Sequence, residues 1–149
     1  MKKIVIILLL ALIPLSAFAD SCWVLCQPDS WVNIRLHPRK NSEIIGIMEL
    51  GDELETDGIL KNGFLHLTGL ALESSEGWVS MGFITMHEVR VYRFDTEIRS
   101  LGRVACRRSV KGTRRKWLKD GQKISVFAYA DDWAVTNQGF IQTKYLEGF

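Results

Sequence analysis

Two stretches decide the fold: Gly77-Trp-Val-Ser-Met-Gly-Phe-Ile84 and Gly139-Phe-Ile-Gln-Thr-Lys-Tyr-Leu146. In each, a glycine is followed by an aromatic and a β-branched residue, then by three residues, then by an aromatic and an aliphatic residue. Short β-branched and aromatic runs of this kind predict strands. Because the same pattern occurs twice, the chain is predicted to contain an internal repeat.

The segments before these two stretches also superpose. Val32-Asn-Ile-Arg35 aligns with Val104-Ala-Cys-Arg107, and Ile47-Met-Glu-Leu-Gly51 aligns with Trp117-Leu-Lys-Asp-Gly121. The first copy is longer between its later matches, which predicts a loop insertion around residues 67–76. The alignment therefore extends the repeat over most of the chain.

Turn signals separate the short apolar runs. Asn62-Gly63 and Asp120-Gly121 are typical turn dipeptides, since both glycines tolerate a positive φ. No stretch after Asp20 shows the sustained periodicity of an amphipathic helix. The predicted fold class is all-β, and Val89–Tyr92, which alternates apolar and polar residues, is expected to be a strand of the second half.

The first half of the chain resembles the bacterial SH3 (SH3b) family. The resemblance rests on Val32–Arg35 followed by Pro38, on Leu50-Gly51-Asp52 and on Gly77–Ser80. It is weaker in the second half, where Ala105 replaces the asparagine of the first strand and Phe140 the closing tryptophan. The resemblance implies two tandem small SH3-like β-barrels. Members of the family commonly bind cell-wall or protein ligands, often in a groove between the first long loop and the closing strand.

Size favours close packing of the two barrels. A module of about 60 residues buries only about 60% of its unfolded surface and is marginal alone. We therefore expect the barrels to pack closely together.

The N-terminus has the features of a secretory signal peptide. Lys2 and Lys3 precede the apolar run Ile4–Ile13, and Ala17-Phe-Ala19 supplies small residues at a cleavage site. The run is too short to span a bilayer, which needs roughly 20 apolar residues. We predict a signal peptide at 1–19, a first domain at 20–85, a second at 86–149, and export to the periplasm or beyond without a transmembrane segment in the mature chain.

The charge balance differs sharply between the two predicted domains. The 149 residues, 47% hydrophobic and 24% charged, carry a net charge of +2, which Lys2 and Lys3 account for. Residues 20–85 have four basic and ten acidic side chains, whereas residues 86–149 have thirteen basic and seven acidic ones. The mature chain thus joins a half of net charge −6 to a half of net charge +6.

Three interpretations of this segregation stay open. The opposite charges either dock the two domains or successive molecules, or the basic half binds an anionic envelope polymer or acidic protein, or it binds nucleic acid. Nucleic acid is disfavoured because an exported protein rarely meets it. In addition, the segment 103–119 has eight basic residues but only one aromatic residue, Trp117, on which a base could stack. Arginine suits bidentate anion recognition, and five of these eight are arginines.

We select ligand-binding candidates from this basic segment and from the tryptophans near the predicted closing strand. Core packing is an alternative for each tryptophan, particularly for Trp117 and Trp133, which lead strands. The candidates are Trp31, Trp78, Arg107, Arg108, Arg114, Arg115 and Trp117.

Catalytic chemistry is weakly represented. The three histidines are expected to be ordinary surface residues, and Cys106 aligns with Ile34, so its thiol should point into the core. The Cys22-x₃-Cys26 spacing does not match zinc ligands, and we expect no metal, cofactor or catalytic residue. A disulfide between Cys106 and either Cys22 or Cys26 is the favoured pairing if one forms.

The sequence therefore predicts an exported, non-catalytic binding protein. Its expected partner is peptidoglycan, another envelope polymer, or a periplasmic or secreted protein. The alternatives are an accessory cell-wall hydrolase with unrecognised catalytic carboxylates, and a structural protein that self-associates through its oppositely charged domains. The clustered carboxylates at 49–57 are expected to form a solvated acidic face. The oligomeric state and the ligand stay open.

Overall fold

The computed structural model describes residues 19–149, so the predicted signal peptide lies almost entirely outside the described residues. Thirteen strands and two short 3₁₀ turns make up the described chain. The first half contains β1 (Asp20–Val24), β2 (Val32–Arg35), β3 (Ile44–Met48), β4 (Glu53–Lys61), β5 (Phe64–Thr68), β6 (Gly77–Ser80), η1 (Met81–Phe83) and β7 (Ile84–Thr85). The second contains β8 (Phe94–Glu97), β9 (Val104–Arg107), β10 (Arg114–Leu118), β11 (Lys123–Tyr129), β12 (Trp133–Thr136), β13 (Gly139–Gln142) and η2 (Thr143–Tyr145).

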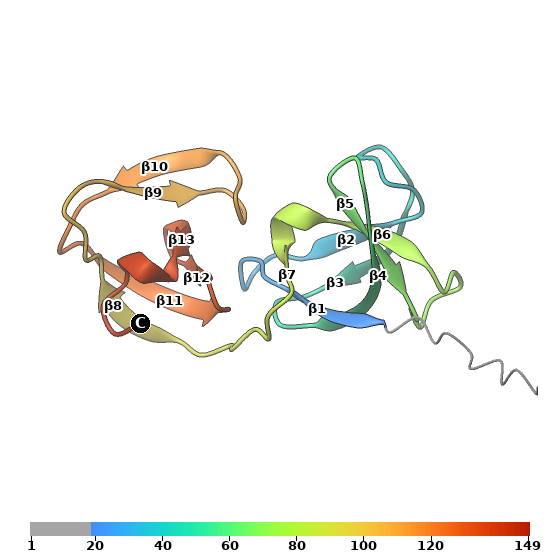
Figure 1. The fold of residues 1–149 in the computed structure, drawn as a ribbon, viewed down its shortest axis with the longest axis horizontal. Coiled ribbons are helices and arrows are strands. Elements are labelled where there is room, and N and C mark those ends of the chain that lie inside the picture. Colours follow the sequence, from blue (N-terminus) through green and yellow to red (C-terminus); the bar gives the residue numbers. More distant parts are fainter. Residues whose placement is uncertain (1–18) are drawn as a thin grey trace, which may run out of the picture.

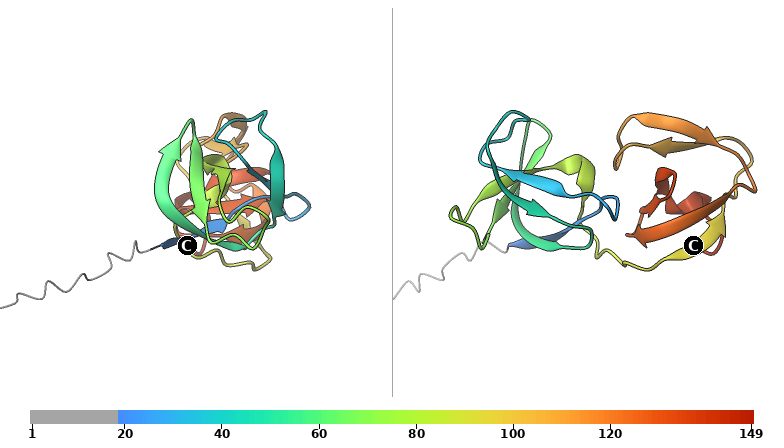
Figure 2. Two further views of the ribbon diagram at one scale, coloured as in Figure 1. Left: turned by 90° about the vertical axis from the view of Figure 1, so that its right-hand side faces the viewer. Right: turned by 180° about the vertical axis from the view of Figure 1, so that it is seen from behind.

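The strands form two separate antiparallel sheets, which lie side by side and bend strongly (Figures 1 and 2). The N-terminal sheet has the order β3-β2-β6-β5-β4-β1-β7, and the C-terminal sheet has the order β10-β9-β13-β12-β11-β8. The first six strands of one order correspond, in chain sequence, to the six of the other. The prediction of an all-β chain is confirmed, and the aligned segments at Val32 and Val104 begin corresponding strands.

The predicted turns and insertion agree with the structure. Asn62 and Gly63 have φ values of 53° and 77°, the positive values that a tight hairpin between β4 and β5 requires. The loop from β5 to β6 spans residues 69–76, whereas β12 and β13 are joined through residues 137–138. The prediction of a strand at Val89–Tyr92 is wrong, because this segment forms only an isolated bridge from Arg90 to Tyr129 before β8 begins.

Each sheet encloses its own apolar core. The N-terminal core gathers alternate residues of β2, β5 and β6, among them Ile34, Leu67 and Val79, all fully buried. The C-terminal core includes Val104, Val126 and Ile141. This alternation arises because successive side chains of a strand point to opposite faces.

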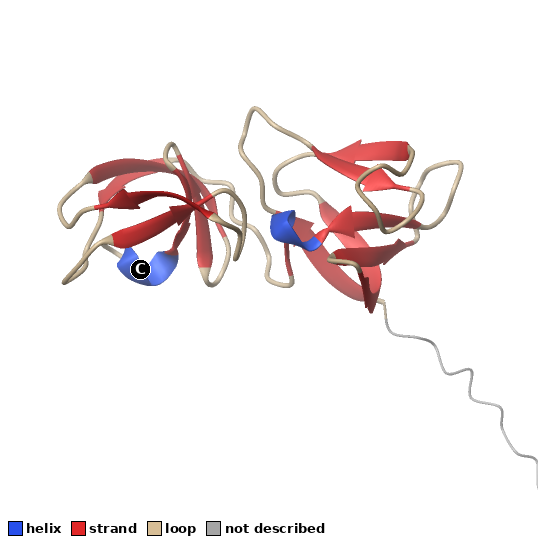
Figure 3. Ribbon diagram, turned by 90° about the horizontal axis from the view of Figure 1, so that it is seen from above, coloured by secondary structure: helices blue, strands red, loops and turns tan. Residues whose placement is uncertain are grey.

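A third apolar cluster joins the two sheets. We call it the seam: Leu25 and Phe83 from the first half pack with residues of β11, β12 and β13 from the second. The rings of Phe83 and Phe140 lie 6.2 Å apart in an edge-on arrangement. Figure 3 shows η1 on the side of the first half that faces the second. The full seam comprises Leu25, Val89, Ala128, Ala130, Trp133, Val135 and Phe140, with Trp23, Leu50, Phe83, Val110 and Phe127 at its margin.

Hydrogen bonds between uncharged groups also join the two halves at the seam. The Val110 N–H donates to the Gly82 carbonyl at 2.9 Å, and Gln27 Nε2 donates to the Thr136 carbonyl at 3.2 Å. The contacts that hold the two halves together are therefore apolar packing and neutral hydrogen bonds, and the interpretation that their opposite charges help to dock them, or successive molecules, stays a prediction. Within residues 19–149, no helix has the length and apolar character needed to cross a bilayer.

Candidate functional site

The structure divides the predicted ligand-binding residues among three places. Trp31 lines a groove on the N-terminal sheet, Trp78 packs beside that groove, and the arginines with Trp117 lie on the β9–β10 hairpin of the other sheet. The sequence prediction treated Trp31 and Trp78 as one surface and the basic residues as another. Of these places, the groove combines the widest range of side chains, with aromatic, cationic and amide groups in one lining.

The groove has a volume of about 420 Å³ and lies against the outward-facing side chains of β2, β6 and β5. Register explains why they meet: Arg35 is paired with Trp78 and Phe64 with Ser80, and directly paired residues project to the same side of a sheet. Its lining consists of Trp31, Val32, Asn33, Arg35, Lys40, Asn62, Gly63, Phe64, Ser80 and Phe83. We call this side of the N-terminal sheet the open face.

One wall of the groove is the loop between β2 and β3, which spans residues 36–43. Internal hydrogen bonds hold the loop: the Leu36 N–H donates to the Glu43 carbonyl at 3.0 Å, and the His37 N–H donates to Ser42 Oγ at 2.8 Å. Arg35 Nη1 also donates to the Ser42 carbonyl at 2.8 Å. These bonds run within the loop and to its neighbouring strand, so they fix the shape of the wall, which is what preorganisation for binding requires.

The β4–β5 turn fixes the opposite wall. Asn62 Nδ2 donates to the Pro38 carbonyl at 3.2 Å and so ties the turn to the loop. Asn62 needs a positive φ to form this turn, which asparagine tolerates better than most residues. The turn and the loop that border the groove are therefore hydrogen-bonded to each other.

The chemistry of the groove is mixed. Trp31 is 60% exposed, an unusually open position for a large aromatic side chain, whereas Phe64 is buried in the floor. Arg35 and Lys40 supply positive charge, and Asn33 and Asn62 supply amide groups. An aromatic wall with a few polar groups is typical of ligand sites, and this set suits an amphipathic ligand that carries carboxylates.

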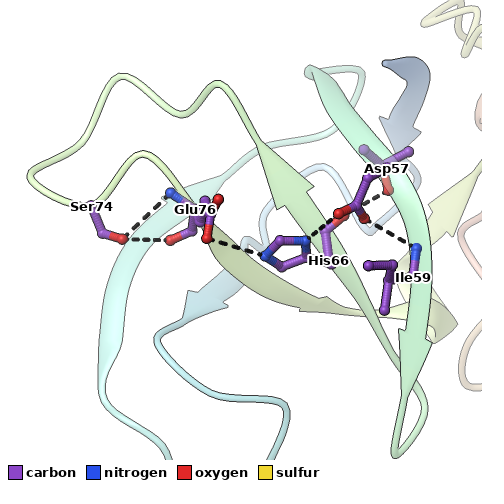
Figure 4. Close-up of polar contacts among 6 residues, drawn as sticks. Asp57, Ile59, His66, Ser74 and Glu76 are labelled. Atoms are coloured by element: carbon purple, nitrogen blue, oxygen red, sulfur yellow. Dashed lines mark hydrogen bonds and ion pairs between the residues drawn. The ribbon is translucent and has the colours of Figure 1, made fainter. Parts of the chain in front are cut away.

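Trp78 lies on the same face as the groove but contacts a polar cluster. Its ring centre is 4.7 Å from that of His66, and His66 Nδ1 lies 2.7 Å from Asp57 Oδ2. The second ring nitrogen of His66 lies 3.7 Å from Glu76 Oε2 (Figure 4). His66 is thus held between two carboxylates, and its prediction as an ordinary surface residue is wrong; His37 and His87 are exposed as predicted.

The His66 cluster favours the ionised form of Asp57. Partial burial opposes ionisation, but hydrogen bonds from His66 and from the Ile59 N–H outweigh it, so the pKa of Asp57 is lower than usual. The cluster spans β4, β5 and the end of the 69–76 loop, and Ser74 Oγ accepts from the Glu76 N–H and donates to the Glu76 carbonyl. It braces the long loop, which lies at the end of the β5–β6 hairpin away from Phe64 and Ser80 of the groove.

The basic candidates split into two groups. Arg107, Arg108 and Arg115 line a hollow at the seam, whereas Arg114 and Arg103 lie over the indole of Trp117, at 4.5 and 5.1 Å from its ring. Trp117 is 43% exposed, so its alternative assignment to the core is wrong, while Trp133 is buried as that assignment expected.

The cysteines are free and buried. Cys22 belongs to the N-terminal core and Cys106 to the C-terminal core, so the described chain carries no bridge between Cys106 and either Cys22 or Cys26. Burial, with the carboxylate of Glu53, raises the pKa of Cys22 to about 11, and burial with Asp52 and Glu49 does the same for Cys26. Burial likewise raises the pKa of Cys106. Such thiols are poor nucleophiles at neutral pH.

Of the ten residues that line the groove, sequence reasoning selected only Trp31 as a ligand-binding candidate. Phe64 and Phe83 come from segments that lie apart in the sequence, and only the folded sheet brings them to Trp31. Lys40 and Asn62 were visible as a loop cation and a turn residue, but nothing in the sequence places them together. Among residues 19–149, no group of three or more His, Cys, Asp or Glu side chains is arranged to hold a metal ion.

Comparison with known proteins gives little guidance. No family model matches the chain, and no curated protein matches it. Two solved structures are similar over 88% of the chain: NlpC1 from Trichomonas vaginalis, with 13% identity and a TM-score of 0.37, and NlpC2 from the same organism, with 12% identity and a TM-score of 0.38. The chain spans only 46% and 48% of their lengths. Similarity at this level carries no argument about fold or activity.

Proposed function

We propose that this chain is an exported, non-catalytic binding protein built from two tandem SH3-like domains, and that its groove takes a segment of peptidoglycan. The observation that carries the proposal is the groove on the open face, with an exposed tryptophan on one wall and a rigid loop enclosing it. Its position between the first long loop and the strand β6 agrees with the ligand groove that the SH3b resemblance implies.

The groove chemistry supports a peptidoglycan ligand. A glycan with peptide stems presents apolar sugar faces beside carboxylates and amides. Trp31 offers an aromatic surface, and Arg35 and Lys40 offer charge for carboxylates. Asn33 and Asn62 supply donors and acceptors for amides.

The non-catalytic part of the proposal rests on the thiols and carboxylates. The raised pKa values of the buried cysteines disfavour a thiolate nucleophile. Of the carboxylates at 49–57, Glu53, Glu55 and Asp57 alternate along β4 and are exposed, and Glu49 and Asp52 precede the strand. We assign them to a solvated face. Zymography of the mature chain on a cell-wall substrate tests this assignment, and clearing that disappears when one of these carboxylates is replaced by its amide would contradict it.

Binding is tested by sedimentation of residues 20–149 with purified peptidoglycan at low and high salt. The wild-type chain is expected to sediment with the polymer, and Trp31→Ala is expected to weaken binding about tenfold, because an exposed aromatic anchor typically contributes more than 1 kcal/mol. Tyr92→Ala is the matched control, since Tyr92 is 66% exposed and lies outside the groove.

Two results would contradict the groove assignment: a wild-type chain that stays in solution, or equal losses for Trp31→Ala and Tyr92→Ala. Export is a separate part of the proposal. It is tested by sequencing the N-terminus of protein recovered from outside the cytoplasm, which should begin at Asp20.

A further inference from the structure

A second candidate site lies where the β9–β10 hairpin meets the first half of the chain. Three guanidinium side chains, Arg107 of β9, Arg108 of the hairpin loop and Arg115 of β10, line one hollow of about 370 Å³. Gln27, from the loop after β1, lines the same hollow. Both halves of the molecule therefore contribute to it, and we call it the arginine hollow.

The strand register explains why the hollow adjoins the seam. Arg107 is paired with Phe140 of β13, so both side chains project from the same side of the C-terminal sheet. The first half covers Phe140, whereas Arg107 lies at the edge of that covered area. The hydrogen bond from the Val110 N–H to the Gly82 carbonyl attaches the 108–113 loop to the first half. It thereby positions the backbone of Arg108, two residues away.

Hydrogen bonds to backbone carbonyls orient some side chains of the hollow, and most of the arginine donors stay free. Arg107 Nη1 donates to the Gly112 carbonyl at 2.9 Å, and Gln27 Nε2 donates to the Thr136 carbonyl at 3.2 Å. A guanidinium has five N–H donors, so each arginine retains several for a ligand. Among the described residues, no carboxylate lies within 4.0 Å of these three guanidinium groups.

The two other arginines of the hairpin are occupied differently. Arg103 and Arg114 lie over Trp117, which satisfies part of their charge through cation–π contact. The three arginines of the hollow, by contrast, have neither a carboxylate within 4.0 Å nor an aromatic ring beneath them among the described residues. Three like charges gathered in one place repel each other, which favours a ligand that neutralises them.

The geometry points to a binding site for a phosphate group in the arginine hollow, distinct from the groove of the proposed function. One carboxylate brings a single charge and about four lone-pair sites, fewer than three arginine forks can use. A phosphomonoester carries about −1.5 to −2 charges at neutral pH and three acceptor oxygens. Its charge and its number of oxygens match a triad of arginines better.

The test measures binding of glucose 1-phosphate and inorganic phosphate to residues 20–149 by calorimetry at low salt. Both probes are expected to bind at one site and to compete. A tighter Kd for glucose 1-phosphate assigns the site to sugar-bound phosphate, and equal Kd values assign it to free phosphate. Arg108→Gln combined with Arg115→Gln, both exposed, is expected to weaken binding at least tenfold, since two charge-assisted hydrogen bonds are lost.

The matched control is Lys61→Gln combined with Lys123→Gln, which removes the same charge from exposed positions outside the hollow. It is expected to change the Kd by less than twofold. Replacing both Arg108 and Arg115 by lysine keeps the charge but removes the forked donors, and is expected to weaken binding several-fold. Thermal unfolding of each variant separates loss of binding from loss of folding.

The proposal is overturned if neither probe binds, if the lysine control loses as much affinity as the arginine pair, or if citrate binds as tightly as glucose 1-phosphate. The two proposed sites can be tested independently of each other. Trp31→Ala should keep phosphate binding, and the arginine pair should keep sedimentation with peptidoglycan.

Discussion

The two sheets use corresponding faces in opposite ways. On the N-terminal sheet, the side of β5 and β6 that points away from the core stays accessible and carries the groove with Trp78 and His66. On the C-terminal sheet, the corresponding side of β12 and β13 carries Trp133, Val135 and Phe140, and the first half of the chain covers it. One strand order thus leaves an accessible face with a groove in one half and forms a docking face in the other.

The burial patterns of the strands show that one face is covered and the other is accessible. In β12, all four residues of Trp-Ala-Val-Thr are buried, and in β13 the first three of Gly-Phe-Ile-Gln are. In β6, Gly-Trp-Val-Ser alternates between buried and half-buried positions. A strand that is apolar on both faces needs cover on both, whereas an alternating strand leaves one face for a ligand.

The largest difference between the two faces is expected when the aligned aromatic residues Phe140 and Trp78 are each replaced. Phe140→Ala is expected to lower the free energy of unfolding by about 3–5 kcal/mol, because it removes a fully buried ring at the seam. Trp78→Ala, on the half-buried open face, is expected to cost about 1–2 kcal/mol. Chemical denaturation of both variants measures the difference, and equal losses would show that the two faces are not used differently.

A smaller effect concerns the polar cluster of the open face. Because the folded protein lowers the pKa of Asp57, its carboxylate stabilises the fold above the ordinary carboxyl value of 3.8, and this contribution disappears as the pH falls through the lowered pKa. Asp57→Asn is expected to cost less than about 1 kcal/mol at pH 7, as for other partly exposed pairs.

The pH profile identifies the origin of this loss. The gap in unfolding free energy between the wild-type chain and Asp57→Asn should close progressively on acidification below pH 4. Asp95→Asn, at an exposed carboxylate of the other sheet, is the matched control. A gap that stays constant down to pH 2 would assign the loss to packing and not to the charge of Asp57.

The sequence contained the information for the strands but only part of that for their packing. Turn dipeptides and the repeated Gly-aromatic-β-branched pattern act locally, so Asn62-Gly63, β6 and β13 were predictable. The seam depends on contacts between distant residues such as Phe83 and Phe140. Its signals in the sequence were the small size of each module and the apolar residues on both faces of β12 and β13.

The candidate sites were predictable to different degrees. Charge clustering identified the arginines of the hairpin, but the division between the arginine hollow and the Trp117 stack depends on strand register. Trp31 was identified without its partners Phe64 and Phe83, because three separate segments meet only in the folded sheet. His66 gave no signal, since the carboxylates of Asp57 and Glu76 reach it only across neighbouring strands.

The central claim is that the open face binds ligand and the covered face does not. The most direct measurement is an NMR titration of residues 20–149 with a soluble peptidoglycan fragment, following backbone amides. The account predicts that Asn33, Arg35 and Phe64 shift in proportion to occupancy while residues 133–142 stay unchanged. Shifts centred on residues 133–142, or none at a saturating concentration of fragment, would contradict it.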